Sequence, residues 1–384
     1  MSFRHIYWLI LALLHIVALP ILVLLSFKQR YKQSIPARFF LLNNSKPKDS
    51  DIWFHASSLG ETIALSPLIE YFKDKKLFIS STTQTGFDRA GEYSIQRAYL
   101  PFETLLKFWI PSAKVLVVME AELWLLLFTY AKSRGTKTVL INARISDRSI
   151  NSYMRFRWLY KKVFAQIDEV YAQSIIDKER LESLGAINVQ VSGNIKLAQV
   201  PKVKTKLSKP NSLVITAAST HKGEEEGIVE AYLKFGRGKL VVVPRHPERF
   251  ESVAKMMQKY ADSNNRTFEK FSLSKELKAD MILVDVMGEL NSIYAVTDIT
   301  VLGGAFEKVG GHNPLEPLYF SNRIVSGKEI FNQRSLFEAM KNVHFSSLDK
   351  LSEMLEVALN SEPASLKQEC DIDNIINSIS KEIK

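Results

Sequence analysis

The residues with the clearest chemical capacity lie in a glycine-rich stretch, residues 303–317, with the sequence GGAFEKVGGHNPLEP. An apolar run at 299–302 precedes it and predicts a buried strand. The glycines let the backbone adopt positive φ angles and let a ligand approach closely. Asn313 is suited to cap a helix whose first residue is Pro314. A strand, a glycine loop and a helix start would together present several backbone N–H groups to an anion.

Glu316 lies in the first turn of that predicted helix. A carboxylate there would repel a phosphate, but it can accept hydrogen bonds from sugar hydroxyl groups. The stretch therefore favours a nucleotide whose ribose and phosphate are bound by separate groups. The alternative is that the stretch only turns the chain. This alternative stays open because the stretch matches neither G-x-G-x-x-G nor the P-loop pattern.

Charged groups also follow other apolar runs. Glu61 ends the segment HASSLGE after the run 52–56, and Glu120 follows the run 115–119. Glu61 is either a general base or a residue that only complements a helix dipole. Lys196, in GNIK, is a candidate for contact with an anion, although a single cation of this kind is more often a surface charge.

The second half of the sequence repeats this arrangement. Pro244 and Arg245 open the segment PRHPER after the run 239–243, and the segment MGEL (287–290) follows the run 281–284. Packing alone does not explain polar and cationic groups after successive strands. These segments therefore predict one shared ligand site.

The elements that must position these groups alternate between short apolar runs and helical patterns, which indicates parallel sheets covered on both faces. We expect two doubly wound domains joined by a polar linker at 199–212, with ligands bound in a cleft beyond the carboxyl ends of the strands. The predicted strands are 52–56, 77–80, 115–119, 138–141, 169–172, 213–217, 239–243, 281–284 and 299–302, and the predicted helices of the first half are 62–72, 122–133 and 175–184.

The N-terminal run 6–27 is apolar and about as long as a bilayer core requires. A cleaved signal peptide is the alternative, but the run is longer than a usual signal core and no small-residue cleavage site follows it. The basic residues Lys28, Arg30 and Lys32 place the following domain on the cytoplasmic side. His15 and Pro20 leave open whether the segment spans the membrane or only dips into it.

Composition restricts the possible partners. The chain has 384 residues, a formal net charge of +10 and a single cysteine, Cys370. The excess of basic residues suggests an anionic partner, and one cysteine excludes an intramolecular disulfide. No recognition helix or stacking sheet supports nucleic-acid binding.

Residues 152–162, SYMRFRWLYKK, predict either a basic amphipathic surface that docks on anionic lipid or an ordinary helix with its aromatic side chains in the core.

The ordered motifs closely resemble those of the 3-deoxy-D-manno-octulosonic acid (Kdo) transferases of bacterial lipid A and lipopolysaccharide biosynthesis. The resemblance extends to about residue 340. It implies a GT-B fold of two Rossmann-like domains facing a cleft, and inverting, metal-independent transfer of Kdo from CMP-Kdo to a lipid A precursor, lipid IVA. The motifs that carry it are HASSLGE, EAELW, NARIS, GNIK, STHKGEE, PRHPER, MGEL and GGHNPLE.

The resemblance also implies roles for individual residues. Glu61 would be the proton acceptor, and Glu120 and Lys196 would support the transition state. No metal or other cofactor is expected, because no D-x-D pair follows a strand. The residues implied to surround CMP are Pro244, Arg245, Met287, Gly288, Glu289, Asn313, Pro314, Leu315 and Glu316. Leu125, where the family usually has proline, and Ala305-Phe306, where it usually has Ser-Leu, leave the local loop shape in doubt.

The expected organisation is a membrane anchor at 1–28, an acceptor-binding domain at 29–198, the linker, a CMP-Kdo-binding domain at 213–362 and a helical tail at 363–384. The expected location is the cytoplasmic face of the bacterial inner membrane, in contact with anionic lipid. A glycosyltransferase that uses a UDP-sugar and a membrane-tethered nucleotide sensor remain alternatives. The sequence leaves open the number of Kdo residues transferred and the acyl pattern of the acceptor.

Overall fold

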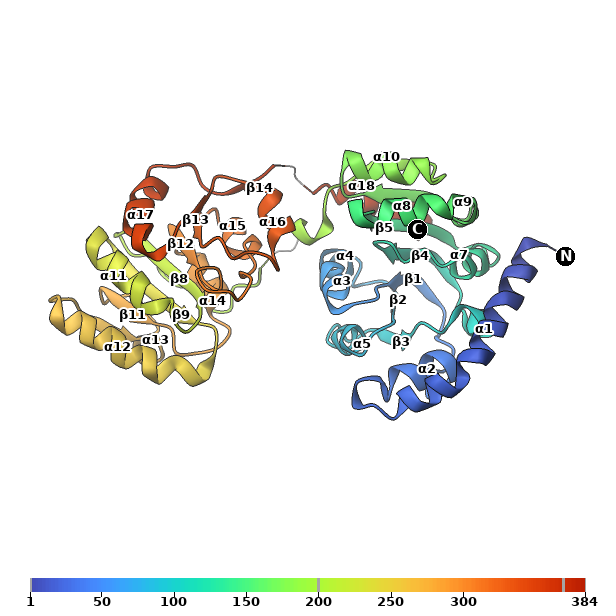
Figure 1. The fold of residues 1–384 in the computed structure, drawn as a ribbon, viewed down its shortest axis with the longest axis horizontal. Coiled ribbons are helices and arrows are strands. Elements are labelled where there is room, and N and C mark those ends of the chain that lie inside the picture. The colour runs from blue at the N-terminus through green and yellow to red at the C-terminus, as the bar shows by residue number, and fades with distance from the viewer. Residues whose placement is uncertain (1, 199–200, 368–369, 384) are drawn as a thin grey trace. The chain divides into compact units, whose positions relative to one another are not determined.

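The computed structural model describes residues 2–198, 201–367 and 370–383. The remaining positions of the predicted anchor, linker and tail (1, 199–200, 368–369 and 384) lie outside the described residues. The chain divides into an N-terminal unit, residues 1–199 with 369–384, and a C-terminal unit, residues 200–368. Figure 1 shows that helices cover both faces of the sheet in each unit.

The N-terminal unit contains, within its described part, a seven-stranded parallel sheet of order β3-β2-β1-β4-β5-β6-β7. The chain reverses its direction of winding between β1 and β4, and ligands of doubly wound folds bind beside such switch points. The strands are β1 (Ser50–His55), β2 (Leu77–Ser81), β3 (Gln96–Tyr99), β4 (Ala113–Met119), β5 (Lys137–Ala143), β6 (Glu169–Ala172) and β7 (Val189–Val191).

Alternating side chains of this sheet enter two separate cores because neighbouring strand residues point to opposite faces. Trp53 and Phe78 join one core, and Ile52, Phe54 and Ile79 join the other. The helices of the unit are α1 (Phe3–Ser26), η1 (Gln29–Tyr31), α2 (Ser34–Phe40), α3 (Leu59–Ala64), α4 (Ser66–Tyr71), α5 (Gln84–Gly91), η2 (Glu103–Leu105), α6 (Leu106–Trp109), α7 (Leu125–Lys132), α8 (Asp147–Arg155), α9 (Arg157–Phe164), α10 (Ile175–Ser183), η3 (Ile195–Ala198) and α18 (Asp373–Glu382).

The single helix predicted at 62–72 is wrong, because the structure has two short helices, α3 and α4, that meet at Leu65. Pro67 cannot donate to the carbonyl of Ile63 and would clash with it, so the helix cannot continue unbroken. The consequence is local: Glu61 still lies in the first turn of a helix that directly follows β1.

The C-terminal unit contains, in its described part, a second seven-stranded parallel sheet of order β10-β11-β9-β8-β12-β13-β15. Its winding reverses between β8 and β12. Two doubly wound α/β units, together with α1, form the GT-B type of organisation that the sequence predicted. The strands are β8 (Val214–Thr220), β9 (Lys239–Pro244), β10 (Phe268–Lys270), β11 (Met281–Leu283), β12 (Ile299–Leu302), β13 (Arg323–Ser326) and β15 (Val343–Phe345), with a small pair β14 (Met340–Lys341) and β16 (Ser365–Leu366).

The helices of the C-terminal unit pack their apolar sides on this sheet. Ile228 and Tyr232 of one helix and Val253 and Met257 of another are buried in the same core. The helices are α11 (Glu225–Phe235), η4 (Pro247–Arg249), α12 (Phe250–Ser263), α13 (Phe271–Ser274), α14 (Leu290–Tyr294), α15 (Leu315–Tyr319), α16 (Arg334–Glu338), η5 (Leu348–Lys350) and α17 (Leu351–Leu359).

The N-terminal helix α1 has 24 residues and is, among those described, the one helix long and apolar enough to cross a membrane. One side of it contacts the N-terminal unit: Tyr7 Oη donates to Glu103 Oε2 at 2.9 Å, and Trp8 Nε1 donates to the carbonyl of Thr104 at 3.0 Å. The exposed large apolar side chains of α1 are Ile6, Leu9, Ile10, Leu13, Leu14, Ile16, Val17, Ile21, Val23 and Leu24.

The aromatic, basic segment 152–162 divides between α8 and α9. Trp158 is 56% exposed and Phe156 is 48% exposed, so these two side chains do not enter the core. The Trp158 ring instead contacts the ring of Phe3 at 5.8 Å between centroids. The exposed apolar surface of α1 therefore continues onto α9.

Candidate active site

Glu61 is held at the carboxyl end of β1 by a closed set of local hydrogen bonds. Its Oε2 accepts from the Ser57 N–H at 2.8 Å, and its Oε1 accepts from the Ser58 hydroxyl at 2.8 Å. The Ser58 Oγ in turn accepts from the Glu61 N–H, which caps α3. This reciprocal arrangement is close to a capping box. It fixes the carboxylate in one position and leaves it only 9% exposed.

Burial raises the pKa of the Glu61 carboxyl, and the nearby charges of Glu120 and Glu122 raise the pKa further. The hydrogen bonds from Ser58 and Ser57 oppose this shift without cancelling it. A carboxylate with a raised pKa is a stronger base than an exposed one. The arrangement can therefore accept a proton from a hydroxyl group that reaches it.

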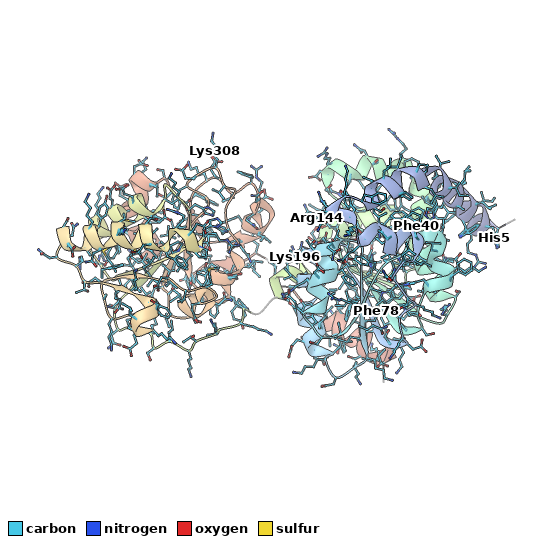
Figure 2. All side chains as sticks on the ribbon, turned by 90° about the horizontal axis from the view of Figure 1, so that it is seen from below. His5, Phe40, Phe78, Arg144, Lys196 and Lys308 are labelled. Carbon is cyan, nitrogen blue, oxygen red and sulfur yellow. The ribbon has the colours of Figure 1, made fainter. Side chains whose placement is uncertain are left out.

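Glu120 and Lys196, which the sequence places 76 residues apart, form an ion pair of 3.1 Å between Nζ and Oε1. Asn142 joins them, since its Oδ1 accepts from the Ile195 N–H at 3.0 Å and its Nδ2 donates to Glu120 at 3.4 Å. Figure 2 shows Lys196 and Arg144 on the same side of the N-terminal unit in that view, and Phe78 within it.

Two of these residues have a positive backbone φ angle. Glu120 has φ 55° and Asn142 has φ 54°, although neither is glycine. Positive φ is unfavourable for a side chain with Cβ, and such strain is concentrated at functional sites. Glu120 directly follows β4 and Asn142 is the penultimate residue of β5, so both lie at the edge of the sheet where Glu61 lies.

His55 and Glu122 were absent from the predicted site residues. His55 is fully buried at the end of β1, its Nδ1 lies 2.9 Å from Ser80 Oγ, and its Nε2 lies 3.9 Å from Glu122 Oε2. The indole N–H of Trp124 also donates to Glu122, at 2.6 Å. A histidine inside a strand that is otherwise apolar was the available signal for this contact.

In the C-terminal unit the glycine loop after β12 differs from the sequence-based expectation. The Glu224 carboxylate, which is completely buried, accepts from the N–H groups of Gly304 at 2.9 Å and Phe306 at 3.1 Å. The same carboxylate accepts from the His221 N–H at 2.8 Å. Part of the donor set that was expected to bind an external anion is therefore satisfied by the protein's own carboxylate.

Gly303 lies where no side chain fits, because a Cβ there would be 2.7 Å from the Ser219 carbonyl oxygen and 2.9 Å from the Glu224 carboxylate. The expected helix start is displaced by one residue. Asn313 Oδ1 accepts from the Leu315 N–H at 3.0 Å, and α15 begins at Leu315. This helix has only five residues, so its dipole contributes less to anion binding than the sequence suggested.

Arg245 directly follows Pro244 at the end of β9 and is exposed. No ion pair within 4.0 Å joins it to a carboxylate of the described chain. Burial raises the pKa of Glu316, while the charge on Arg245 lowers it. The unit therefore presents a free guanidinium beside a partly desolvated carboxyl group.

Two further histidines adjoin these groups. His312 Nε2 lies 2.8 Å from His221 Nε2. Burial lowers the pKa of His312 to about 4, with contributions from His221, Arg245 and His246. His312 is consequently neutral near pH 7. The sequence motifs contained both His221 and His312, but their meeting in space depends on β8 and β12, which are neighbours only in the folded sheet.

The other residues predicted to surround CMP, Met287, Gly288 and Glu289, directly precede α14. Met287 and Gly288 lie on the turn before α14, where Met287 is 54% exposed and Gly288 has φ 83°. Glu289 accepts from Thr205 Oγ1 at 3.1 Å and pairs with Lys204 at 3.4 Å. Its carboxylate thus binds the segment that precedes β8, and no hydrogen bond or ion pair joins it to Arg245 in the described chain.

Comparison with known proteins decides the family. A family model described as 3-deoxy-D-manno-octulosonic-acid transferase (kdotransferase) matches residues 33–199. The chain is 34% identical to the 3-deoxy-D-manno-octulosonic acid transferase of Haemophilus influenzae, over 88% of this chain and 86% of that protein. The chain belongs to the 3-deoxy-D-manno-octulosonic acid transferase family.

A second relative agrees with this family. The corresponding transferase of Chlamydia muridarum is 30% identical over 81% of this chain and 78% of that protein. Among solved structures, the C-terminal CMP-Kdo binding domain of WaaA from Acinetobacter baumannii is 27% identical, over 45% of this chain and 86% of that domain, with a TM-score of 0.34. As a Kdo transferase, the chain is a glycosyltransferase enzyme.

Proposed function

We propose that this Kdo transferase moves Kdo from CMP-Kdo to a lipid A precursor, lipid IVA, with inversion at the transferred sugar. Glu61 would be the general base. The observation that carries the proposal is the fixed and buried Glu61 carboxylate with its raised pKa, at the carboxyl end of a central strand. The family supports Kdo as the transferred sugar, and the buried Glu61 carboxylate supports the assignment of the base that the reaction requires.

In the proposed step an acceptor hydroxyl oxygen attacks the anomeric carbon of Kdo while its proton passes to Glu61. The bond between that carbon and the phosphate oxygen breaks, and CMP leaves with the electron pair. A single displacement of this kind inverts the configuration. The Glu120–Lys196 pair would stabilise the charge that develops during transfer, supported by its short contact of 3.1 Å.

CMP would bind in the C-terminal unit, near the residues predicted from the sequence. Arg245 would bind the phosphate, because it is exposed and lacks a carboxylate partner in the described chain. Glu316 would accept hydrogen bonds from the ribose. A cation supplied by arginine can stabilise the departing phosphate, so we propose a transfer that requires no divalent metal ion.

The proposed location is the cytoplasmic face of the bacterial inner membrane. The apolar exposed side of α1 would contact the bilayer interior. The exposed cations Arg155 and Arg157, beside Phe156 and Trp158, would contact anionic lipid head groups.

The proposal is tested by incubating the purified full-length protein with CMP-Kdo and tetra-acylated lipid A precursor and measuring product masses. We expect the mass of one or more Kdo residues to be added, equally well with EDTA present. Competition by CMP but not by UDP distinguishes this donor from a UDP-sugar. Absence of any Kdo adduct would refute the proposed reaction, and loss with EDTA that magnesium restores would refute its independence of metals.

A further inference from the structure

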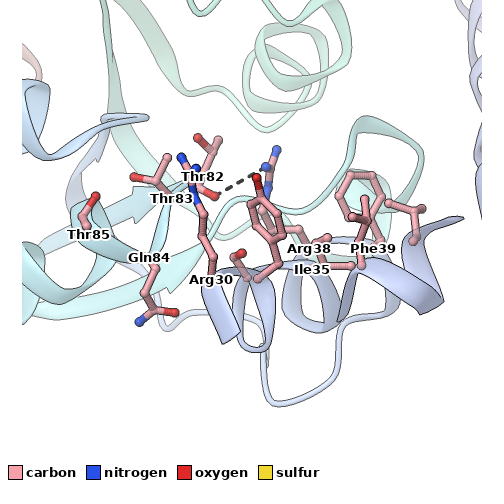
Figure 3. A pocket seen from close by; sticks show the side chains of 12 residues that line it. Arg30, Ile35, Arg38, Phe39, Thr82, Thr83, Gln84 and Thr85 are labelled. Atoms are coloured by element: carbon pink, nitrogen blue, oxygen red, sulfur yellow. Dashed lines mark hydrogen bonds between the residues drawn. The ribbon is translucent and has the colours of Figure 1, made fainter. Parts of the chain in front are cut away.

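A cavity of about 500 Å³ lies in the N-terminal unit between the end of α1, the segment η1–α2 and the start of α5. Figure 3 shows its two sides, with Arg30, Ile35, Arg38 and Phe39 on the helical side and Thr82 to Thr85 opposite. The cavity belongs to the same unit as Glu61 but contains none of the site residues predicted from the sequence.

The cationic part of the cavity consists of Arg38 and Arg30. Arg38 donates from Nε to the carbonyl of Leu100 at 3.0 Å and from Nη1 to the carbonyl of Thr82 at 3.5 Å. No ion pair within 4.0 Å reaches Arg38 or Arg30 from the described residues. Burial lowers the pKa of Arg38, while the charge of Glu122 raises it. A partly desolvated guanidinium that is held by two carbonyl groups and the Phe39 ring, with no ion pair to a described carboxylate, favours an anionic ligand.

The other part of the cavity is apolar. Leu22 and Leu25 of α1 line it together with Ile35 and Phe39 of α2. The opposite side of α1 is the exposed apolar surface described above. One wall of the cavity is therefore formed by the helix that would lie against the bilayer, which gives a lipid chain a route into it.

Hydrogen bonds connect the cavity to Glu61. Thr83 Oγ1 donates to the Ser57 carbonyl at 2.7 Å, and Thr82 Oγ1 donates to the same oxygen at 3.2 Å. The N–H of Ser57 is the group that donates to Glu61 at 2.8 Å. One residue, Ser57, thus separates the cavity lining from the proposed base. The positions of the cavity lining and of the proposed base are therefore coupled through this residue.

We propose that this cavity is the acceptor subsite, in which Arg38 and Arg30 bind a phosphate of the acceptor and the apolar wall binds one of its acyl chains. The inference rests on the proposed function, because it names where the lipid acceptor of that reaction is held. A ligand that is both anionic and acylated matches the two halves of the cavity, and its sugar hydroxyl would then lie toward Glu61.

The apolar half is tested by filling it. We expect Leu25→Trp to raise the KM for tetra-acylated precursor by about tenfold or more, which corresponds to about 1.4 kcal/mol, while the KM for CMP-Kdo stays unchanged. Leu24→Trp is the matched control, because Leu24 is the neighbouring residue of α1 and is 70% exposed. An unchanged acceptor KM in Leu25→Trp, with wild-type transfer intact, would overturn the subsite but leave the proposed function standing.

The cationic half is tested with precursor that carries its phosphates and with precursor from which they have been removed. We expect wild type to bind the phosphate-free form at least about tenfold more weakly, and Arg38→Gln to bind both forms equally weakly. Arg38→Lys should recover part of the difference, and Lys48→Gln, an exposed cation outside the cavity, should behave as wild type.

Unchanged circular dichroism spectra and melting temperatures verify that each variant is folded, because CMP binding would report on the other unit. If Arg38→Gln retains the wild-type preference for the phosphorylated form, the assignment of the phosphate is wrong. If phosphatidylglycerol vesicles compete with the precursor in wild type but not in Arg38→Gln, the cavity binds bilayer phospholipid and the acceptor assignment fails. If wild type itself transfers no Kdo, the proposed function fails first.

Discussion

Glu61 combines two roles that the sequence presented as alternatives. Its carboxylate takes part in the cap of α3 through Ser58, and the same hydrogen bonds fix its position at the edge of the sheet. A carboxylate has about four acceptor sites, and the Ser57 and Ser58 donors occupy two of them. A substrate hydroxyl can therefore reach the carboxylate without displacing the cap.

We expect Glu61→Gln to reduce the single-turnover rate of Kdo transfer by about a hundred- to ten-thousandfold, because glutamine cannot accept a proton. CMP affinity should be unchanged. Since the pKa of Glu61 is raised, the wild-type rate should increase with pH through that pKa and level off above it. Glu92→Gln, on an exposed turn, is the control. A variant that transfers normally but melts at a lower temperature would show that Glu61 is only a cap.

Arg245→Ala should weaken CMP binding by roughly ten- to a hundredfold, because a charge-assisted hydrogen bond contributes about 1.5–3 kcal/mol. Calorimetry with CMP measures this directly. Lys308→Ala removes another exposed cation of the same unit and should have little effect. Equal losses in the two variants would indicate general electrostatic attraction in place of a specific contact at Arg245.

At the level of residues, the sequence predicted that Glu61 and Glu120 lie at one edge of the sheet, because carboxyl ends of parallel strands share an edge. Glu120 directly follows β4, and Glu61 lies in the first turn of the helix after β1. It could not predict that Glu224 binds the glycine loop. The motif containing Glu224 and that loop are about 80 residues apart, and only the pairing of β8 with β12 brings them together. The same pairing accounts for the unforeseen contact between His221 and His312.

At the level of elements, the glycine loop depends on a buried carboxylate that makes three hydrogen bonds to main-chain donors. We expect Glu224→Gln to lower both the melting temperature and the affinity for CMP. The glutamine amide would direct its N–H₂ group at the main-chain N–H donors of His221, Gly304 or Phe306. Each buried donor left without an acceptor costs about 1–3 kcal/mol of stability. Glu226→Gln, exposed on the same helix, is the control. Wild-type stability and CMP affinity in Glu224→Gln would show that this carboxylate does not support the loop.

The contact of α1 with the N-terminal unit should depend on pH through Glu103. Burial raises the pKa of Glu103 to about 7, against hydrogen bonds from Leu126 and Tyr7 that lower it. The folded chain therefore keeps this proton where the unfolded chain has lost it. The stability from this group is greatest below the unfolded pKa of 4.5 and decreases as pH rises toward 7.

Glu103→Gln does not titrate, so the melting temperature of wild type should fall relative to this variant between pH 5 and pH 7.5. The shift in the pKa of Glu103 corresponds to a change of at most about 3 kcal/mol in the free energy of unfolding. Melting curves of both proteins over this range measure the difference. A constant difference in melting temperature would mean that Glu103 does not change its ionisation in this interval.

Element boundaries were predictable only where local signals were strong. The strands at 169–172 and 299–302 agree with β6 and β12. The helix at 62–72 does not, because the apolar periodicity continues across Pro67 while the backbone hydrogen bonds do not. Periodicity reports which side of a segment is buried, but it does not report whether the backbone hydrogen bonds continue.

At the scale of the whole chain, the C-terminal helix α18 shows a contact that no local pattern indicates. Its residues Ile375, Ile376 and Ile379 are buried in the core of the N-terminal unit, against Phe54 and Val117. Tyr171 Oη donates to the Asn374 carbonyl at 3.2 Å. The apolar positions of the helix predict that one side is buried, but not on which unit.

The position of α1 against the N-terminal unit bears on its arrangement in the membrane. Tyr7, Trp8 and His15 all contact residues 102–104 or their neighbours, so the first half of the helix lies alongside the folded unit. A helix that spans a bilayer would carry these contacts into the apolar interior, where polar groups of the unit lose their solvation. A helix in the plane of the interface keeps the contacts and buries only its exposed apolar side.

We therefore expect both ends of α1 to lie on the same side of the membrane. Single cysteines at Ser2→Cys and Lys28→Cys, each in a Cys370→Ser background, can be labelled in sealed vesicles with an impermeant maleimide. For an in-plane helix, both positions react in inside-out vesicles and neither reacts in right-side-out vesicles. Protection of one end in each orientation would show that α1 spans the bilayer, and the contacts of Tyr7 and Trp8 would then have to be absent from the membrane-bound enzyme.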